Sequence, residues 1–296
     1  MKQIILFFFL LLGFAAGAQN VTVKKPKKAQ QTTTQAAPKR LQKEAPKKNV
    51  ASNAQSKPAK KVEAKRVVRT FYANGVSFEM VEVRGGTFRM GATSEQGSDA
   101  GSDEKPVHSV TLSSYYIGKT EVTQALWKAV MGDNPSYFKG DNLPVEDVSW
   151  NDCQVFVRKL NSLTGQRFRL PTEAEWEYAC RGGNNSRGYK YSGSNYIEDV
   201  AWYGDNSGSE THPVASKSPN ELGLYDMSGN VWEWCSDWYG SYTSVSQTNP
   251  QGPYDGSSRV FRGGSGSCYA RGCRSSLRLS RDPACRLNSL GLRLAL

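Results

Sequence analysis

The sequence predicts a single α+β domain that is rich in loops and carries little regular secondary structure. Three observations support this fold class. The 296 residues are 38% hydrophobic and 22% charged, which permits a packed core. Helical patterns are few and short, and capping residues mark their ends. Strand-like runs are equally short and lie between stretches rich in Gly, Ser and Asn, so loops are expected to dominate.

The first 18 residues have the pattern of a secretory signal peptide. Lys2 precedes an apolar run at residues 4–14, and small residues follow it. The run is too short to cross a bilayer, so no transmembrane segment is expected. The signal peptide is expected to be cleaved before Gln19. No cysteine follows this cleavage site, so a lipid anchor is not expected either. The chain is therefore predicted to be exported, to the periplasm or the extracellular space.

Residues 19–66 are predicted to form a disordered, basic tether. Lys, Ala, Gln, Thr and Pro dominate this segment, which lacks the apolar side chains that a core requires. Positions 21–66 hold 14 Lys or Arg against two Glu, a net charge of +12. Such a segment serves either as a solvated spacer or as a polycation that adheres to an anionic envelope polymer.

The charge of the remaining chain excludes one class of function. Residues 67–296 carry 23 basic and 25 acidic groups, a net charge of −2, although the whole chain has a net charge of +11. A nucleic-acid-binding domain needs positive charge clustered on its folded surface. No nucleic-acid partner is therefore expected.

Within residues 67–296, the capping patterns predict three short helices. Each begins at a capping Thr or Ser and ends at a Gly: Thr123 to Gly132, Ser149 to Gly165, and Thr172 to Gly182. In the third, Thr172 and Glu175 form a capping box. Strands are predicted at residues 78–83, 109–112 and 260–262.

A loop-rich domain needs rigidity from sources other than long helices, and the chain offers seven Trp, six Cys or a bound metal. An even cysteine count in an exported protein favours disulfides, although six cysteines allow 15 pairings. The spacing of the cysteines excludes a CxxC zinc or redox site. They are Cys153, Cys180, Cys235, Cys268, Cys273 and Cys285.

Seven different motifs are distributed through residues 75–296. They are GGTFRMG at 85–91, TEVT at 120–123, PV with VSW at 144–150, RLPTEAEWEY at 169–178, GLYDMSGNVWEW at 223–234, RGGS at 262–265 and LGLR at 290–293. Together and in this order, they resemble the formylglycine-generating enzymes, also called sulfatase-modifying factors. The resemblance implies a single loop-rich α+β domain similar to C-type lectins, the fold of that family.

The resemblance also implies an activity and a copper site. Members of the family oxidise a cysteine in an extended sulfatase peptide, Cys-x-Pro-x-Arg, to Cα-formylglycine with O2 and Cu(I). Cys268 and Cys273 match the two thiolates that hold the copper, and two soft sulfur ligands suit Cu(I). Ser265 resembles the active-site serine, and Trp232 resembles the tryptophan that borders the pocket for oxygen and substrate.

A calcium site is implied by the same resemblance. Its expected ligands are the carboxylates of Asp226 and Glu233 and the carbonyls of Gly229 and Val231. These are hard oxygen ligands on one tight loop, as Ca²⁺ prefers. The alternative is a loop held by hydrogen bonds alone.

Two hypotheses about function stay open at the level of sequence. In the first, the domain is a copper-dependent oxidase. In the second, it is a non-catalytic module of the same fold that binds a peptide or glycan in the cell envelope, and Cys273 forms a disulfide with Cys235. Two departures from the family pattern bear on this choice, since Gly266 replaces the usual aromatic residue and Ser289 replaces an asparagine.

Overall fold

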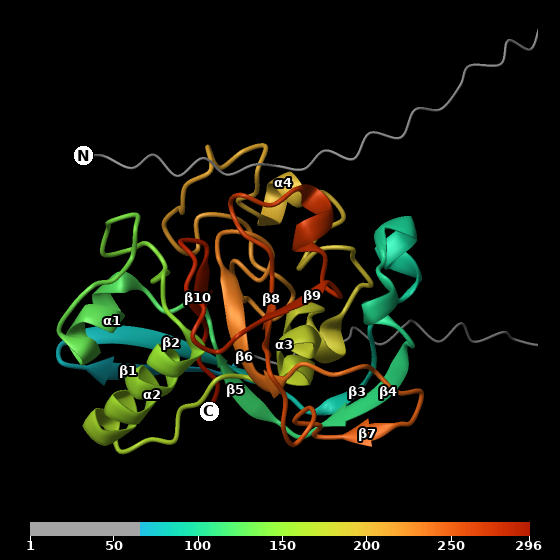
Figure 1. Ribbon diagram of the computed structural model, residues 1–296, viewed down its shortest axis with the longest axis horizontal. Coiled ribbons are helices and arrows are strands. Elements are labelled where there is room, and N and C mark those ends of the chain that lie inside the picture. The colour runs from blue at the N-terminus through green and yellow to red at the C-terminus, as the bar shows by residue number, and fades with distance from the viewer. Residues whose placement is uncertain (1–65) are drawn as a thin grey trace, which may run out of the picture. The chain divides into compact units, whose positions relative to one another are not determined.

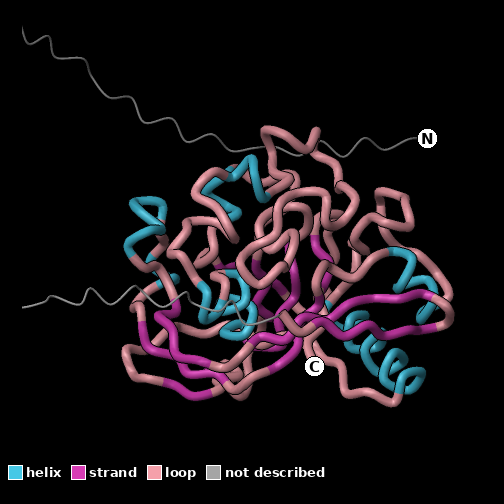
Figure 2. The backbone as a smooth tube through the Cα atoms, turned by 180° about the vertical axis from the view of Figure 1, so that it is seen from behind, coloured by secondary structure: helices cyan, strands magenta, loops and turns pink. Residues whose placement is uncertain are grey.

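A computed structural model describes residues 66–296 (Figure 1). The predicted signal peptide and all but the last residue of the predicted tether lie outside the described residues. Loops connect small sheets and short helices, and Figure 2 shows strands gathered in the lower half of the view and loops filling the upper half. The predicted α+β, loop-rich architecture is therefore confirmed.

Ten strands form three small sheets within the described residues. The first has the order β1-β2-β5, the second β10-β6-β8-β9 and the third β3-β4-β7. Neighbouring strands are antiparallel except in the pairs β10·β6 and β4·β7. The strands are β1 (Val68–Ala73), β2 (Val76–Val83), β3 (Gly86–Met90), β4 (His108–Leu112), β5 (Tyr115–Gly118), β6 (Trp232–Trp238), β7 (Gln247–Thr248), β8 (Arg259–Arg262), β9 (Arg278–Arg281) and β10 (Leu290–Leu292).

The three predicted helices are confirmed, with the predicted caps. They are α1 (Gln124–Met131), α2 (Trp150–Thr164) and α3 (Glu173–Cys180), and a short α4 (Ile197–Val200) follows. The Thr123, Ser149 and Thr172 side chains each accept a hydrogen bond from the backbone three residues on. Helices α1 and α2 pack against β1 and β2, whereas α3 packs against β3, β6 and β8 (Figure 1).

Buried ion pairs hold the interior together beside the apolar core. Among the described residues, five Arg–Glu pairs have side chains that are almost entirely buried: Arg262–Glu177, Arg262–Glu173, Arg274–Glu104, Arg278–Glu173 and Arg293–Glu233. Buried charges are tolerated only when they are paired and hydrogen-bonded. These pairs therefore connect segments that lie far apart in the sequence.

The disulfides expected from the even cysteine count are not formed. All six cysteines lie within the described residues and are free thiols. The alternative bond between Cys235 and Cys273 is also not formed, because the two residues lie in different clusters of the core. Among residues 66–296, no helix has both the length and the apolar character needed to cross a bilayer.

Candidate functional site

The predicted copper ligands lie on the loop that follows β8. Gly263 and Gly264 have φ values of 104° and 83°, a backbone conformation that is unfavourable for residues other than glycine. A Cβ on Gly264 would lie 2.6 Å from Sγ of Cys273, so glycine is also needed for the loop to reach that thiol. The loop then returns through the 3-10 helix η4 (Ala270–Cys273), which lies beside α4 in Figure 1.

The structure brings three of the predicted residues together. The Ser265 hydroxyl is buried and lies 3.2 Å from Sγ of Cys268. Cys268 and Cys273 share one small cluster with residues of α4 and η4. Cys273 is fully buried, and its pKa is raised by this burial and by the neighbouring Cys268. Cys268 is partly exposed, whereas Cys273 is not.

Trp232, the fourth predicted residue, reaches the same region from β6. Its ring is almost completely buried and packs edge-on against Phe261, with ring centroids 5.2 Å apart. Cys268 packs against the cluster that contains Trp232. Trp234, two residues on, is fully buried and belongs to the core alone. Trp232 and Cys268 therefore belong to the same region of the core.

The predicted calcium loop, residues 226–233, supports the cysteine loop directly. The Gly229 amide donates to the Gly263 carbonyl, and the Gly266 amide donates to the Asn230 carbonyl, each over 2.8 Å. The Ser228 hydroxyl donates to the Cys273 carbonyl over 2.9 Å. An ion that orders the first loop would therefore also order the second.

Asp226 has the properties of a cation ligand. Its Oδ2 accepts a hydrogen bond from the Ala215 amide, whereas its buried Oδ1 has no partner among the described residues. Burial raises the pKa of Asp226 to about 6. A buried carboxylate oxygen without a donor fits a hard cation such as Ca²⁺.

Glu233 has a different environment from the one predicted. Its carboxylate pairs with the Arg293 guanidinium through contacts of 2.7 to 3.1 Å, and it also accepts a hydrogen bond from Trp176 Nε1. Within residues 66–296, no three acidic, His or Cys side chains are arranged to hold an ion. A calcium ion here would thus depend on Asp226 and backbone carbonyls more than on Glu233.

Glu121 belongs to this site and was not predicted as a site residue. Its carboxylate accepts hydrogen bonds from Asn230 Nδ2 and from the Val231 amide, and so it fixes the loop from the opposite side. Burial, followed by the charges of Asp226 and Glu233, raises the pKa of Glu121 well above its usual value. The sequence signal that could have identified Glu121 as a site residue is its position in the TEVT motif at 120–123.

The replacement of the usual aromatic residue by Gly266 has a visible cause. A Cβ at this position would lie 2.7 Å from the carbonyl oxygen of Glu210. The loop at residues 207–210 thus occupies the space that a side chain would need. The Ser207 hydroxyl donates a hydrogen bond to the Gly266 carbonyl and ties the two loops together.

Comparison with known proteins identifies the family of this chain and several of its relatives. Residues 64–296 match the family described as "Sulfatase-modifying factor enzyme 1-like domain". The formylglycine-generating enzyme of Streptomyces coelicolor is 33% identical over 284 residues, which cover 73% of this chain and 88% of the enzyme. Chaperone protein LppX of Paenibacillus barcinonensis is 38% identical over 239 residues, covering 64% of this chain and 79% of that protein.

Solved structures show the same fold. Treponema denticola variable protein 1 superimposes with a TM-score of 0.70 at 37% sequence identity, over 77% of this chain and 98% of that protein. The family match and the fold therefore agree over the whole described region. The chain belongs to the sulfatase-modifying factor family, which includes the formylglycine-generating enzymes.

Proposed function

We propose that this protein is a copper-dependent oxidase that converts the cysteine of a Cys-x-Pro-x-Arg sulfatase peptide to Cα-formylglycine. One observation carries the proposal. Cys268 and Cys273 are free thiols in one cluster, and the Ser265 hydroxyl lies 3.2 Å from the more exposed of the two. The family membership gives this arrangement its chemical meaning.

The two thiols fit Cu(I), which accepts a low coordination number and sulfur ligands. Bound between Cys268 and Cys273, copper would supply the centre at which O2 is reduced. The buried Cys273 would anchor the ion, and the partly exposed Cys268 leaves a side open for a substrate thiol. Ser265 would orient Cys268 through its hydroxyl, and Trp232 would keep water from the inner wall.

The overall conversion balances with a thiol reductant. The C–S bond of the substrate cysteine breaks, the carbon is oxidised to an aldehyde and the sulfur leaves as hydrogen sulfide. O2 is reduced and also yields one water molecule, and two electrons and two protons come from the thiol reductant. The protein itself binds the peptide and positions the reacting cysteine.

Calcium would act on this site through the loop at residues 226–233. Asp226 and the carbonyls of Gly229 and Val231 would hold the ion. The hydrogen bonds from Ser228 and Gly229 to the cysteine loop would transmit its ordering effect. Calcium is thus proposed to be structural rather than part of the reaction.

The proposed setting is outside the inner membrane, in the periplasm or extracellular space. This follows from the apolar run after Lys2 and the small residues behind it. The basic segment at residues 19–66 is proposed to contact an anionic envelope polymer. Both proposals rest on the sequence alone.

The proposal is tested with the full mature chain, Cu(I), a thiol reductant and a synthetic Cys-x-Pro-x-Arg peptide in air. Mass spectrometry should show formation of the aldehyde. Cys268→Ser and Cys273→Ser should each abolish it, whereas Cys285→Ser, a change at another partly exposed cysteine, should not. Equal activity in Cys273→Ser and the parent protein would refute the proposed metal site.

A non-catalytic module of the same fold is the second candidate. The observation in its favour is Gly266, where the loop at residues 207–210 fills space beside the cysteine loop. Such a module would bind a peptide or glycan without changing it. Binding of the Cys-x-Pro-x-Arg peptide with no aldehyde formation by the copper-loaded protein would favour this candidate.

A further inference from the structure

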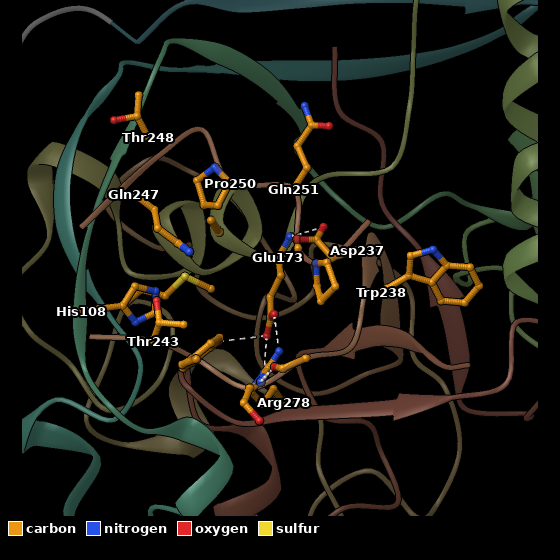
Figure 3. Close-up of a pocket in the computed structure, with 17 residues that line it drawn as sticks. His108, Glu173, Asp237, Trp238, Thr243, Gln247, Thr248, Pro250, Gln251 and Arg278 are labelled. Carbon is orange, nitrogen blue, oxygen red and sulfur yellow. Dashed lines mark hydrogen bonds and ion pairs between the residues drawn. The ribbon is translucent and has the colours of Figure 1, made fainter. Parts of the chain in front are cut away.

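A cavity of about 510 Å³ lies apart from the cysteine and calcium loops. None of its lining residues belongs to residues 226–233 or 263–273. It is a half-open pocket lined by the start of α3, the end of β6 and the segment that follows β6 (Figure 3). Its volume is in the range of small-molecule sites, which extends from roughly 300 to 1,000 Å³. The cavity is therefore large enough for a ligand of its own.

The charges of the lining leave one carboxylate without a counter-ion. Glu173 and Asp237 are the acidic residues of the lining, and Arg278 is its arginine. The carboxylate of Glu173 forms a two-bond pair with the Arg278 guanidinium, and both distances are 2.7 Å. This pair is neutral as a unit. When ionised, Asp237 therefore gives the cavity a net charge of −1.

Asp237 is held rigidly and offers one free oxygen. The residue is only 4% exposed. Its Oδ2 accepts hydrogen bonds of 2.9 Å from the Glu173 amide and from the Ser236 hydroxyl. Its Oδ1 accepts none from the described residues, and no Lys, Arg or His among them lies within ion-pair distance. Burial, and then the charge of Glu173, raises the pKa of Asp237 to about 7.

The rest of the cavity offers neutral polar groups. His108, Thr243 and Gln247 lie on one side of the cavity, with Asp237 nearer its centre (Figure 3). His108 Nδ1 lies 3.1 Å from the Pro106 carbonyl, which only accepts, so Nδ1 carries the proton. These groups suit a polar ligand that donates hydrogen bonds.

We propose that this cavity binds a ligand through an ammonium group that pairs with Oδ1 of Asp237. A single positive charge complements the single unpaired carboxylate, and a charge-assisted hydrogen bond to a carboxylate that is itself buried is strong. Thr243, Gln247 and His108 would bind polar groups on the remainder of the ligand. The ammonium group can belong to a free small amine or to a lysine side chain of a peptide.

Binding should depend on pH, because only the ionised form of Asp237 pairs with ammonium. The charged and titratable groups that influence Asp237 from the surrounding elements are Glu173 and Glu175 of α3, Arg169 before it, Arg259 of β8 and Cys235 of β6. Below pH 7 the affinity should rise about tenfold per pH unit, and above that value it should level off.

The experiment uses the full mature chain and three probes in calorimetric titrations. Nα-acetyl-lysine N-methylamide carries the ammonium group, and its Nε-acetylated form is the neutral match. The charged probe should bind at least about tenfold more tightly at pH 8. The third probe, 5-amino-1-pentanol, identifies the source. If this probe binds as tightly as Nα-acetyl-lysine N-methylamide, the natural ligand is a free amine. If it binds much more weakly, the natural ligand is a lysine side chain of a peptide.

Two variants complete the test. Asp237→Asn should weaken binding of the charged probe at least about tenfold, whereas Asp255→Asn, at an exposed position outside the cavity, should not. If Asp237→Asn fails to fold, carbon-13 NMR of the parent protein replaces it, and the Asp237 pKa should fall on addition of the charged probe. Equal binding of the charged and neutral probes, or an Asp237 pKa that the probe leaves unchanged, would overturn the proposal.

Discussion

Asp226 is the residue on which the proposed calcium site depends most directly. Its φ is 58°, in the left-handed region that Asp adopts more readily than most residues, and its buried Oδ1 has no partner among the described residues. A buried carboxylate oxygen without a donor fits a cation ligand. This interpretation predicts linked effects of calcium and pH.

Without calcium, Asp226 should make the protein less stable as pH rises. Its pKa is about 6 in the folded state against an ordinary 3.8, so the folded state binds more protons between these values. The free energy of unfolding then falls as pH increases from about 4 to 7, by at most about 3 kcal/mol. Calcium at one hundred times its Kd should restore about 2.7 kcal/mol at pH 7.5.

Thermal melts at pH 4.5 and 7.5, with calcium or with chelator, measure both effects. Asp226→Asn should remove the calcium response, whereas Asp133→Asn at an exposed position should keep it. A calcium response of equal size in Asp226→Asn and in the parent protein would place the ion elsewhere.

Glu233 should matter for stability whether or not calcium is present. Its carboxylate and the Arg293 guanidinium are both fully buried, and Glu233→Gln would leave the arginine charge without its partner. Breaking a buried pair on one side costs about 3 to 5 kcal/mol. Urea unfolding in excess calcium measures this cost. Glu79→Gln, which breaks an exposed pair with Lys119, should cost less than about 1 kcal/mol. Similar costs for both variants would contradict the structural role of the buried pair.

At the scale of elements, the loops around Gly266 fit together without spare room. Gly266→Ala places a methyl group 2.7 Å from the Glu210 carbonyl, and backbone rather than a flexible side chain must move. Overpacking of this kind costs about 1 to 3 kcal/mol. Ser244→Ala, at an exposed position whose side chain makes no hydrogen bond to the described residues, should change the unfolding free energy by less than about 0.5 kcal/mol. Chemical denaturation compares the two, and an unchanged stability of Gly266→Ala would show that the 207–210 loop moves freely.

The helices could be predicted from sequence because their signals are local. Thr123, Ser149 and Thr172 cap helices through contacts three residues away. Strand β6 is not predicted, because both of its faces are buried and its acidic residues interrupt the apolar pattern. Glu233, within β6, meets Arg293 60 residues later in the chain. A local pattern contains no sign of such a partner.

The candidate site was predictable in part for a similar reason. Cys268, Cys273 and Ser265 lie within residues 265–273, so their proximity follows from their spacing and from the family resemblance. Glu121 lies 109 residues from Asn230, the residue whose side chain it binds, and only the fold brings them together. The pairing of Asp237 with the α3 amide and the cavity beside it depend on tertiary structure in the same way.

At the scale of the whole molecule, the chain before Val67 should not contribute to the stability of the domain. The segment at residues 19–66 lacks the apolar side chains needed for packing, and the family match begins at residue 64. Removal of residues 19–66 should leave the Tm within about 5 °C of the parent, equivalent to roughly 1 to 2 kcal/mol. Differential scanning calorimetry of the two proteins makes the comparison, and a larger fall in Tm would show that this segment packs on the domain.

The central claim is that Cys268 and Cys273 form one Cu(I) site, and a competitive Cu(I) titration tests it most directly. The reduced, full mature protein should bind one copper ion tightly. Cys268→Ser and Cys273→Ser should each lose that binding, because a single thiolate does not replace a two-sulfur site, and Cys285→Ser should retain it. Failure of the parent protein to bind copper, or tight binding that survives in either Cys268→Ser or Cys273→Ser, would contradict the assignment.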